Sequence, residues 1–363
     1  MELTFRSLAE RGPGAAWRRA FDAAWPGWRR WYLSRGGAAR LADGERQLRR
    51  HMPELVPVWQ RQLAAVDGDE LAARFLTFWN PPAYLVHCSQ AVLIDAGGPL
   101  LVRNYDLDPR LNEATVLRSA WSGHPVLATM EGIAGAADGV NAAGLAVSLT
   151  FGGREVVGEG FGVPLIVRYL LETCRSVREA VAALRRIPTH MSYNLTLVDP
   201  ASEIVTAFIA PDRPPEFLSR PYATNHQRRV EMHERARFSN TIGREKVLAR
   251  LLGWEGLTAD ELVAAFLAPP LYASRHALGF GTVYTAAYRP EQASVAMHWP
   301  GQEPWRLACE RFEEGLVQVR YGRRVELPEG FGKALEDCLR RPHAADWAGL
   351  GRFWAGAFPQ FAG

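Results

Sequence analysis

The sequence predicts an α+β protein in which an antiparallel sheet system is flanked by helices. Two observations predict this class. Apolar residues follow a helical spacing up to about residue 82 and a spacing of two from residue 83 onwards. In addition, short turns join most of the strand candidates, as in hairpins, and hairpins pair neighbouring strands antiparallel.

The segment 1–87 is expected to form a helical prefix. An aromatic stripe lies along its first helix, and Pro26 is expected to kink that helix. The stripe comprises Trp17, Phe21, Trp25, Trp28 and Tyr32. It fits either core packing, which is usual for such stripes, or a membrane-surface helix with Arg18, Arg19, Arg29 and Arg30 on its other side. We favour core packing.

Further elements follow in order along the chain. Helical runs at 45–66 and 69–79 end at Asn80-Pro81-Pro82, because proline disfavours the helical conformation in the residue before it. Capping boxes are expected at Ser176 with Glu179 and at Thr258 with Glu261. The expected strands are 83–95, 99–107, 126–132, 144–151, 193–199, 203–210, 221–226, 281–290 and 293–301, and the expected helices are 161–187, 241–253 and 258–267.

Composition narrows the classes of function. The 363 residues are 48% hydrophobic and 22% charged, and the net charge of +3 gives no reason to expect a nucleic-acid partner. The four cysteines (Cys88, Cys174, Cys309 and Cys338) form no C-x-x-C, which favours a reducing, cytoplasmic setting. We see no secretory signal, no membrane span and no metal-binding motif. The glycine-rich GEGFG at 158–162 is not a dinucleotide-binding fingerprint and is interpreted as a loop.

Cys88 lies near the start of the first expected strand. His87 is a poor base for it, because adjacent residues of a strand point to opposite faces. If the peptide bond before Cys88 were cut, the freed α-amine, with a reference pKa near 8, could serve as the base. Arg103 and Asp106 lie across the hairpin and could favour the thiolate and orient the amine. A lone buried cysteine and an ordinary Arg–Asp ion pair fit the same residues.

Several segments in order resemble cysteine N-terminal nucleophile (Ntn) hydrolases. Cys88-Ser89 with R-N-Y-D at 103–106 resembles the start of their mature chain. ADGVNAAGLAVSLTF at 137–151 resembles the D-G-x-N-x-x-G-L strand of bile-salt hydrolases and penicillin acylases of the choloylglycine type. GVPLIVRYLLETCRSVREAVAALRRIP, followed by SYNLTLVDP, resembles isopenicillin-N acyltransferase, and YATNH at 222–226 is similar to a motif with a catalytic asparagine.

The resemblance implies a four-layer αββα sandwich for 88–363, the proposed catalytic domain, and self-cleavage between His87 and Cys88. The helical prefix 1–87 resembles the pro-segment of the acyltransferase. Cys88 would be the nucleophile and Asn225 an oxyanion donor, with Arg103 and Asp106 setting ionisation and position. Arg244 would be a second structuring arginine. Asn225 as a turn residue and Arg244 as only a helix-face charge remain alternatives, and Asn141 is interpreted as a turn residue. Thr150 stands where the family often has a second oxyanion asparagine, and His87 where the acyltransferase has glycine.

The sequence thus predicts a self-processing amidase or acyltransferase that acts on linear amide C–N bonds through a Cys88 thioester. Its substrate would be a small molecule or short peptide. No metal or nucleotide is needed, although an acyl-CoA could be a co-substrate, and segment 1–87 is expected to stay bound after cleavage. An uncleaved binding or scaffolding protein of the same fold remains the alternative. The oligomeric state is left open.

Overall fold

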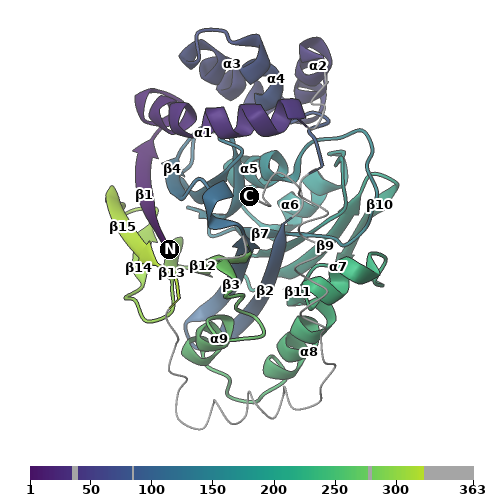
Figure 1. Ribbon diagram of the computed structural model, residues 1–363, viewed down its shortest axis with the longest axis vertical. Coiled ribbons are helices and arrows are strands. Elements are labelled where there is room, and N and C mark those ends of the chain that lie inside the picture. The colour runs from purple at the N-terminus through teal and green to yellow at the C-terminus, as the bar shows by residue number, and fades with distance from the viewer. Residues whose placement is uncertain (35–39, 84–85, 277–279, 323–363) are drawn as a thin grey trace.

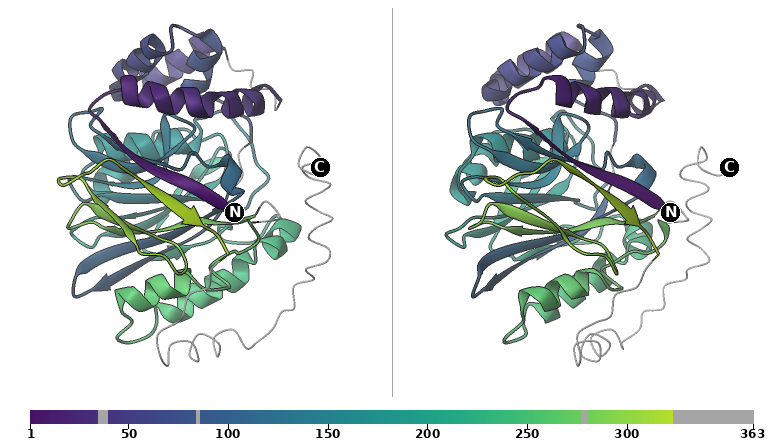
Figure 2. Two further views of the ribbon diagram at one scale, coloured as in Figure 1. Left: turned by 60° about the vertical axis from the view of Figure 1, so that its left-hand side comes forward. Right: turned by 90° about the vertical axis from the view of Figure 1, so that its left-hand side faces the viewer.

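The computed structural model of the chain describes residues 1–34, 40–83, 86–276 and 280–322. Two sheets lie face to face, with helices α5 and α6 outside one of them and α8 and α9 outside the other (Figures 1 and 2). This is the expected α+β, four-layer αββα arrangement. Three parts of the sequence predictions lie outside the described residues: Cys338, positions 84–85 of the first expected strand, and residues 323–363 of the expected catalytic domain.

Among the described residues, one sheet has nine strands in the order β10-β9-β8-β7-β6-β5-β4-β1-β15, and the other has six in the order β11-β2-β3-β12-β13-β14. Sequence neighbours pair as antiparallel hairpins, which confirms the main observation behind the predicted class. The strands are β1 Glu2–Glu10, β2 His87–Asp95, β3 Gly98–Leu107, β4 Thr115–Ser119, β5 Val126–Glu131, β6 Gly135–Asn141, β7 Ala146–Phe151, β8 Tyr193–Val198, β9 Ile204–Ala210, β10 Arg213–Leu218, β11 Tyr222–Ala223, β12 Gly281–Arg289, β13 Ser294–His298, β14 Trp305–Ala308 and β15 Gly315–Arg320.

Two helical runs predicted from the sequence are each divided in the structure. The run expected over 45–66 is broken at Met52 into the helices Leu41–His51 and Val56–Ala65, with a 3-10 turn at Pro53–Leu55 between them. The helix expected over 161–187 is two helices, because the chain leaves the helical path after Thr173 and Ser176 caps a new helix through the Glu179 N–H, at 3.3 Å. The Glu179 carboxylate accepts from the Arg175 N–H, so only half of this capping box forms, whereas the box at Thr258 is complete. The helices are α1 Ala15–Ser34, α2 Leu41–His51, α3 Val56–Ala65, α4 Glu70–Leu76, α5 Val163–Thr173, α6 Val177–Leu184, α7 His233–Phe238, α8 Thr241–Leu251 and α9 Ala259–Phe266, with short 3-10 turns at Pro53–Leu55 and Pro109–Leu111.

The aromatic stripe of α1 packs into the core, as expected. Helices α1 to α4 form a cap above the layer that contains α5 (Figure 1). Trp17 is fully buried and donates its indole N–H to the Ile133 carbonyl, and Trp28 donates to the Glu113 carboxylate at 2.8 Å. Helix α1 continues through Pro26. No helix of the described residues has the length and apolar character needed to cross a bilayer.

Strand β1 was not anticipated from the sequence. It belongs to the segment expected to be helical, yet it lies inside the nine-stranded sheet, parallel to β4 and antiparallel to β15. Its Phe5 is fully buried against Tyr284 and Trp299. Segment 1–87 therefore contributes both a helical cap and a strand that joins the C-terminal β15 to the rest of the sheet.

Candidate active site

The hairpin of β2 and β3 brings Cys88 to the interface between the two sheets. In the register of this hairpin, His87 lies opposite Asp106 and Cys88 lies opposite Tyr105. The short turn after Asp95 sets this register, which in turn decides which residues of β3 face the thiol. Cys88 is fully buried, so the thiol is closed to solvent in the uncut chain.

Arg103 contacts the thiol directly. Its Nη2 donates to Cys88 Sγ at 3.2 Å, and its Nη1 forms an ion pair with Asp138, both partners being fully buried. Asp138 also accepts hydrogen bonds from Tyr284 at 2.9 Å and Tyr288 at 2.6 Å. Burial raises the pKa of the Cys88 thiol, while the adjacent guanidinium lowers it. The arginine thus provides the favourable charge that a buried thiolate would need.

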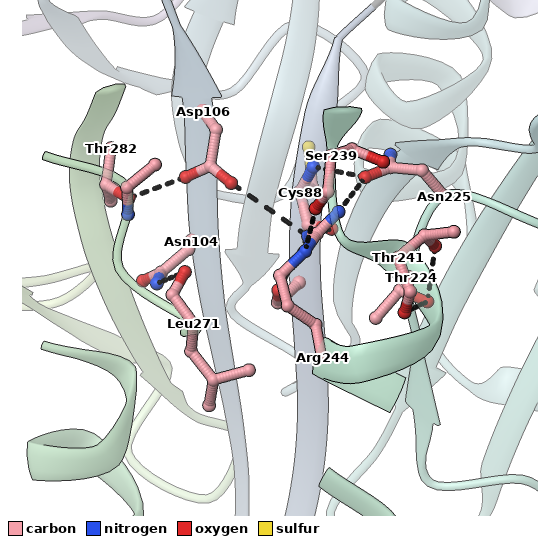
Figure 3. Close-up of polar contacts among 12 residues, drawn as sticks. Cys88, Asn104, Asp106, Thr224, Asn225, Ser239, Thr241, Arg244, Leu271 and Thr282 are labelled. Carbon is pink, nitrogen blue, oxygen red and sulfur yellow. Dashed lines mark hydrogen bonds and ion pairs between the residues drawn. The ribbon is translucent and has the colours of Figure 1, made fainter. Parts of the chain in front are cut away.

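Asn225 contacts the backbone on both sides of the peptide bond before Cys88. Its Oδ1 accepts from the Cys88 N–H at 3.2 Å, and its Nδ2 donates to the Val86 carbonyl at 3.3 Å. The same Nδ2 donates to Thr150 Oγ1 at 2.6 Å, and the Thr150 side chain in turn hydrogen-bonds Cys88. Asn225 and Thr150 therefore both belong to the site, and Asn225 lies on the side of Cys88 away from Asp106 (Figure 3).

Arg244, on α8, connects these groups. Its guanidinium donates to the Cys88 carbonyl, to Ser89 Oγ at 2.8 Å and to Asn225 Oδ1 at 2.6 Å. It also lies 3.9 Å from Asp106 Oδ2 (Figure 3). Arg244 is therefore not merely a helix-face charge, because it is only 2% exposed and contacts Cys88, Ser89 and Asn225.

Asp106 is buried and has few compensating partners. Thr282 Oγ1 donates to Asp106 Oδ1 at 2.6 Å, and Arg244 is its ion-pair partner. Burial raises the pKa of Asp106 to about 6, against the opposing effects of Arg244, Thr282 and Arg103. The carboxylate is close enough to Cys88 to affect the pKa of the thiol, which it raises.

His87 provides the carbonyl of the peptide bond before Cys88, the bond that the sequence analysis expects to be cut. Its ring packs between Phe238, at 5.6 Å, and Phe280, at 5.1 Å between centroids. Burial, and secondarily the charges of Arg235 and Arg244, place the pKa of His87 well below its ordinary value, so the ring is neutral. Its Nε2 has no hydrogen-bond partner within the part of the chain that the structure describes.

The structure thus brings together all the residues singled out from the sequence around Cys88, and it adds one group that was missed. The Asp138 carboxylate, with its two tyrosines, holds Arg103 in place. The signal for Asp138 was present, because it is the aspartate of the D-G-x-N stretch. Asn141 of the same stretch lies apart from the site. As expected, it is a turn residue, accepting from the Ala143 and Leu145 N–H groups.

No group of three His, Cys, Asp or Glu side chains suited to a metal occurs in the ranges described above. Comparison with known families gives one match: the model described as acyl-coenzyme A:6-aminopenicillanic acid acyl-transferase matches residues 95–303, a little over half of the chain. That range includes Arg103, Asp106, Thr150, Asn225 and Arg244 and begins after Cys88. No curated protein matches the sequence.

Solved structures with similar folds are distant in sequence. A mutant of conjugated bile acid hydrolase from Clostridium perfringens is 11% identical, with a TM-score of 0.47, over 67% of this chain and 99% of that one. Penicillin V acylase from Agrobacterium tumefaciens is 10% identical, with a TM-score of 0.42, over 66% and 95%. The Caenorhabditis elegans N-acylethanolamine-hydrolyzing acid amidase orthologue is 16% identical, with a TM-score of 0.38, over 56% and 93%.

Proposed function

This chain belongs to the acyl-coenzyme A:6-aminopenicillanic acid acyltransferase family, and we propose that it is a self-processing cysteine amidase or acyltransferase. The observation that carries the proposal is that Cys88 is contacted at two atoms, its sulfur and its backbone nitrogen. A buried guanidinium contacts its sulfur, and the Asn225 carboxamide accepts from its backbone nitrogen. Charge for a thiolate and a fixed position for the nitrogen are what an N-terminal nucleophile requires.

The first reaction is cleavage of the chain's own peptide bond. The Cys88 sulfur attacks the His87 carbonyl carbon, the C–N bond breaks, and the Cys88 nitrogen takes up a proton to become an amine. The His87 acyl group remains on the sulfur as a thioester. Water then hydrolyses the thioester, which frees the thiol and leaves a carboxylate on His87. Arg103 favours the attacking thiolate in this step.

The cleaved enzyme then acts on other amides by the same bond changes. The freed amine of Cys88, which stays beside Asn225 Oδ1, is the general base. The acyl group of a small-molecule or short-peptide amide passes to the sulfur, and water or an amine accepts it. An acyl-CoA is the matching acyl donor in the direction of transfer. Asn225 and Thr150 supply the polar hydrogens available for the oxyanion.

The test is the acyl-enzyme. The cleaved protein is incubated with simple acyl anilides and with acyl-CoA thioesters, quenched in acid, and its larger chain is weighed by mass spectrometry. We expect an added mass equal to the acyl group on the peptide that begins with Cys88, and its release by hydroxylamine. Turnover without this adduct, or an adduct on another residue, would contradict the Cys88 thioester. A chain that stays whole and is inert to the whole panel would favour the uncleaved binding-protein alternative.

The same assay tests Asn225 as an oxyanion donor. Replacing Asn225 with alanine should lower kcat on the order of 100-fold or more, since that is the typical effect of losing one such donor. The matched control is Asn112→Ala, which removes another buried asparagine, one in the loop before β4 whose side chain accepts from the Ala114 N–H. An equal loss in both variants would point to general damage to the fold.

The rate should also fall in acid because of Asp106. Its pKa of about 6 means that the carboxylate next to Arg244 is neutralised below that pH. Below a pH of about 6 we therefore expect amide turnover to fall more steeply than protonation of the Cys88 α-amine alone would cause, and Asp106→Asn to remove this added decline at a lower overall rate. Since the folded pKa lies above the ordinary 3.8, protonation of Asp106 stabilises the folded state between these pH values. A loss of stability caused by protonation of Asp106 would therefore not explain a decline in turnover. A turnover profile that is flat from pH 5 to 8 would contradict the proposed role of the Asp106 carboxylate.

A further inference from the structure

The chain that leads to the proposed cleavage site is held by the glycine-rich segment at 158–162, which the sequence analysis interpreted only as a loop. We call residues 78–82 the arm and residues 158–162 the clamp loop. The Asn80 N–H donates to the Gly160 carbonyl at 2.9 Å, and the Gly160 N–H donates to Asn80 Oδ1 at 2.8 Å. Asn80 thus contacts both polar backbone groups of one loop residue, once with its own backbone and once with its side chain.

Two more contacts extend this pairing along the arm. The Gly162 N–H donates to the Phe78 carbonyl at 2.8 Å. Trp79 and Phe161 form an antiparallel bridge, and their rings pack edge to face at 5.0 Å. The clamp loop therefore grips three successive residues of the arm.

The backbone of the arm is unusual at two of these positions. Phe78 has φ of 52° and Asn80 has φ of 46°, so two non-glycine residues adopt the left-handed conformation within one short stretch. Asparagine tolerates this conformation better than most residues, and phenylalanine does not. Such conformations persist where surrounding contacts enforce them, and they concentrate at functional sites.

The glycines of the clamp loop are required by close approach. A Cβ on Gly160 would lie 2.3 Å from the Thr189 carbonyl carbon and 2.6 Å from the His190 nitrogen. Behind the loop, His190 contacts the Phe161 carbonyl at 3.3 Å and also hydrogen-bonds the Pro82 backbone. The segment at 189–190 thus supports both the clamp loop and the arm.

The peptide bond to be cut lies just beyond a second anchor. The arm is fixed at 78–82, and Asn225 holds the Val86 carbonyl and the Cys88 nitrogen. We propose that Asn80 and the clamp loop are positioning residues for self-cleavage, which keep the His87 carbonyl within reach of the Cys88 sulfur. This inference rests on the proposed function and assigns it a second, separate group of residues.

The physical reason is the sensitivity of an intramolecular attack to geometry. Reacting atoms must be held about 3 to 3.5 Å apart and aligned, and a misplacement of about 1 Å can cost on the order of 100-fold in rate. Asn225 contacts the chain at the Val86 carbonyl and the Cys88 nitrogen, both next to the bond that breaks. The clamp supplies the second fixed point, and it uses no atom of the bond that breaks.

The test follows the cleavage of freshly synthesised chains over time on denaturing gels, with hydroxylamine added to parallel samples. Asn80→Leu removes the side-chain acceptor and disfavours the left-handed backbone, and we expect cleavage at least about 10-fold slower. Asn80→Asp keeps an acceptor oxygen and should cleave within about 3-fold of wild type. Hydroxylamine should not rescue Asn80→Leu, because the slowed step precedes the thioester. Gly160→Ala should behave like Asn80→Leu.

The matched control is Trp28→Phe, which removes another partly buried hydrogen bond between segment 1–87 and the rest of the chain, the one to Glu113. It should lower the melting temperature while leaving the cleavage rate near wild type. Each variant is also melted with Cys88→Ala, so that stability is compared in whole chains. Asn80→Leu cleaving at the wild-type rate, or only in proportion to its loss of stability, would overturn the proposal. A wild-type chain that stays whole would overturn the proposed function and this inference with it.

Discussion

Replacing Cys88 with alanine should leave a single chain of 40.3 kDa, whereas the wild-type protein should separate under denaturing conditions into pieces of about 10 and 30 kDa. Alanine lacks the sulfur that receives the His87 acyl group, so neither the cut nor the later amide turnover can occur. Intact mass spectrometry and N-terminal sequencing measure this outcome, and the larger piece should begin with Cys88.

The control for this result is Cys174→Ala, which removes another buried thiol, at the end of α5. It should cleave like wild type. A cut at any bond other than that between His87 and Cys88, or cleavage of the Cys88→Ala variant, would contradict self-processing by this thiol. A wild-type chain that stays whole during long incubation under reducing conditions would leave the protein without its α-amino base.

The hairpin that contains Cys88 could be predicted from the sequence because the residues that determine it are close together in the chain. Alternating apolar residues and the turn at 96–98 define both strands, and register then places Arg103 and Asp106 on the strand that faces Cys88. Pairing alone did not show that Arg103 reaches the sulfur while Asp106 faces Arg244. Those side-chain directions depend on groups that other elements bring in.

Long-range features could not be predicted in the same way. Nothing within 2–10 shows that this stretch pairs with residues more than 300 positions away, because its two partner strands are chosen by the assembled sheet. Likewise, the Asp138 carboxylate reaches Arg103 only after the two sheets are packed face to face. Asn225 and Arg244 were identified through the resemblance to a family. Their spacing in the sequence does not show that they contact Cys88.

After cleavage, the smaller piece should remain attached to the larger one. Strand β1 of segment 1–87 lies between β4 and β15, and β15 has β1 as its neighbour in the sheet order. Loss of the segment would therefore expose the edge of β4, detach β15 and uncover the buried surface around Phe5. We expect both pieces to elute together at the size of the whole chain and to separate only in denaturant.

Phe5 provides the quantitative test of this attachment. Its ring is fully buried against Trp299, at 5.0 Å, so Phe5→Ala should lower the free energy of unfolding by about 3–5 kcal/mol, as is usual for a buried phenylalanine. The measurement is denaturant unfolding of the whole chain carrying Cys88→Ala. Leu316→Ala, on the exposed face of β15, should change it little. The contradicting result is a smaller piece that elutes alone while the larger piece stays folded and active. Because a strand can leave the middle of a sheet only if it contributes little to the free energy of unfolding, that result would show that β1 is dispensable.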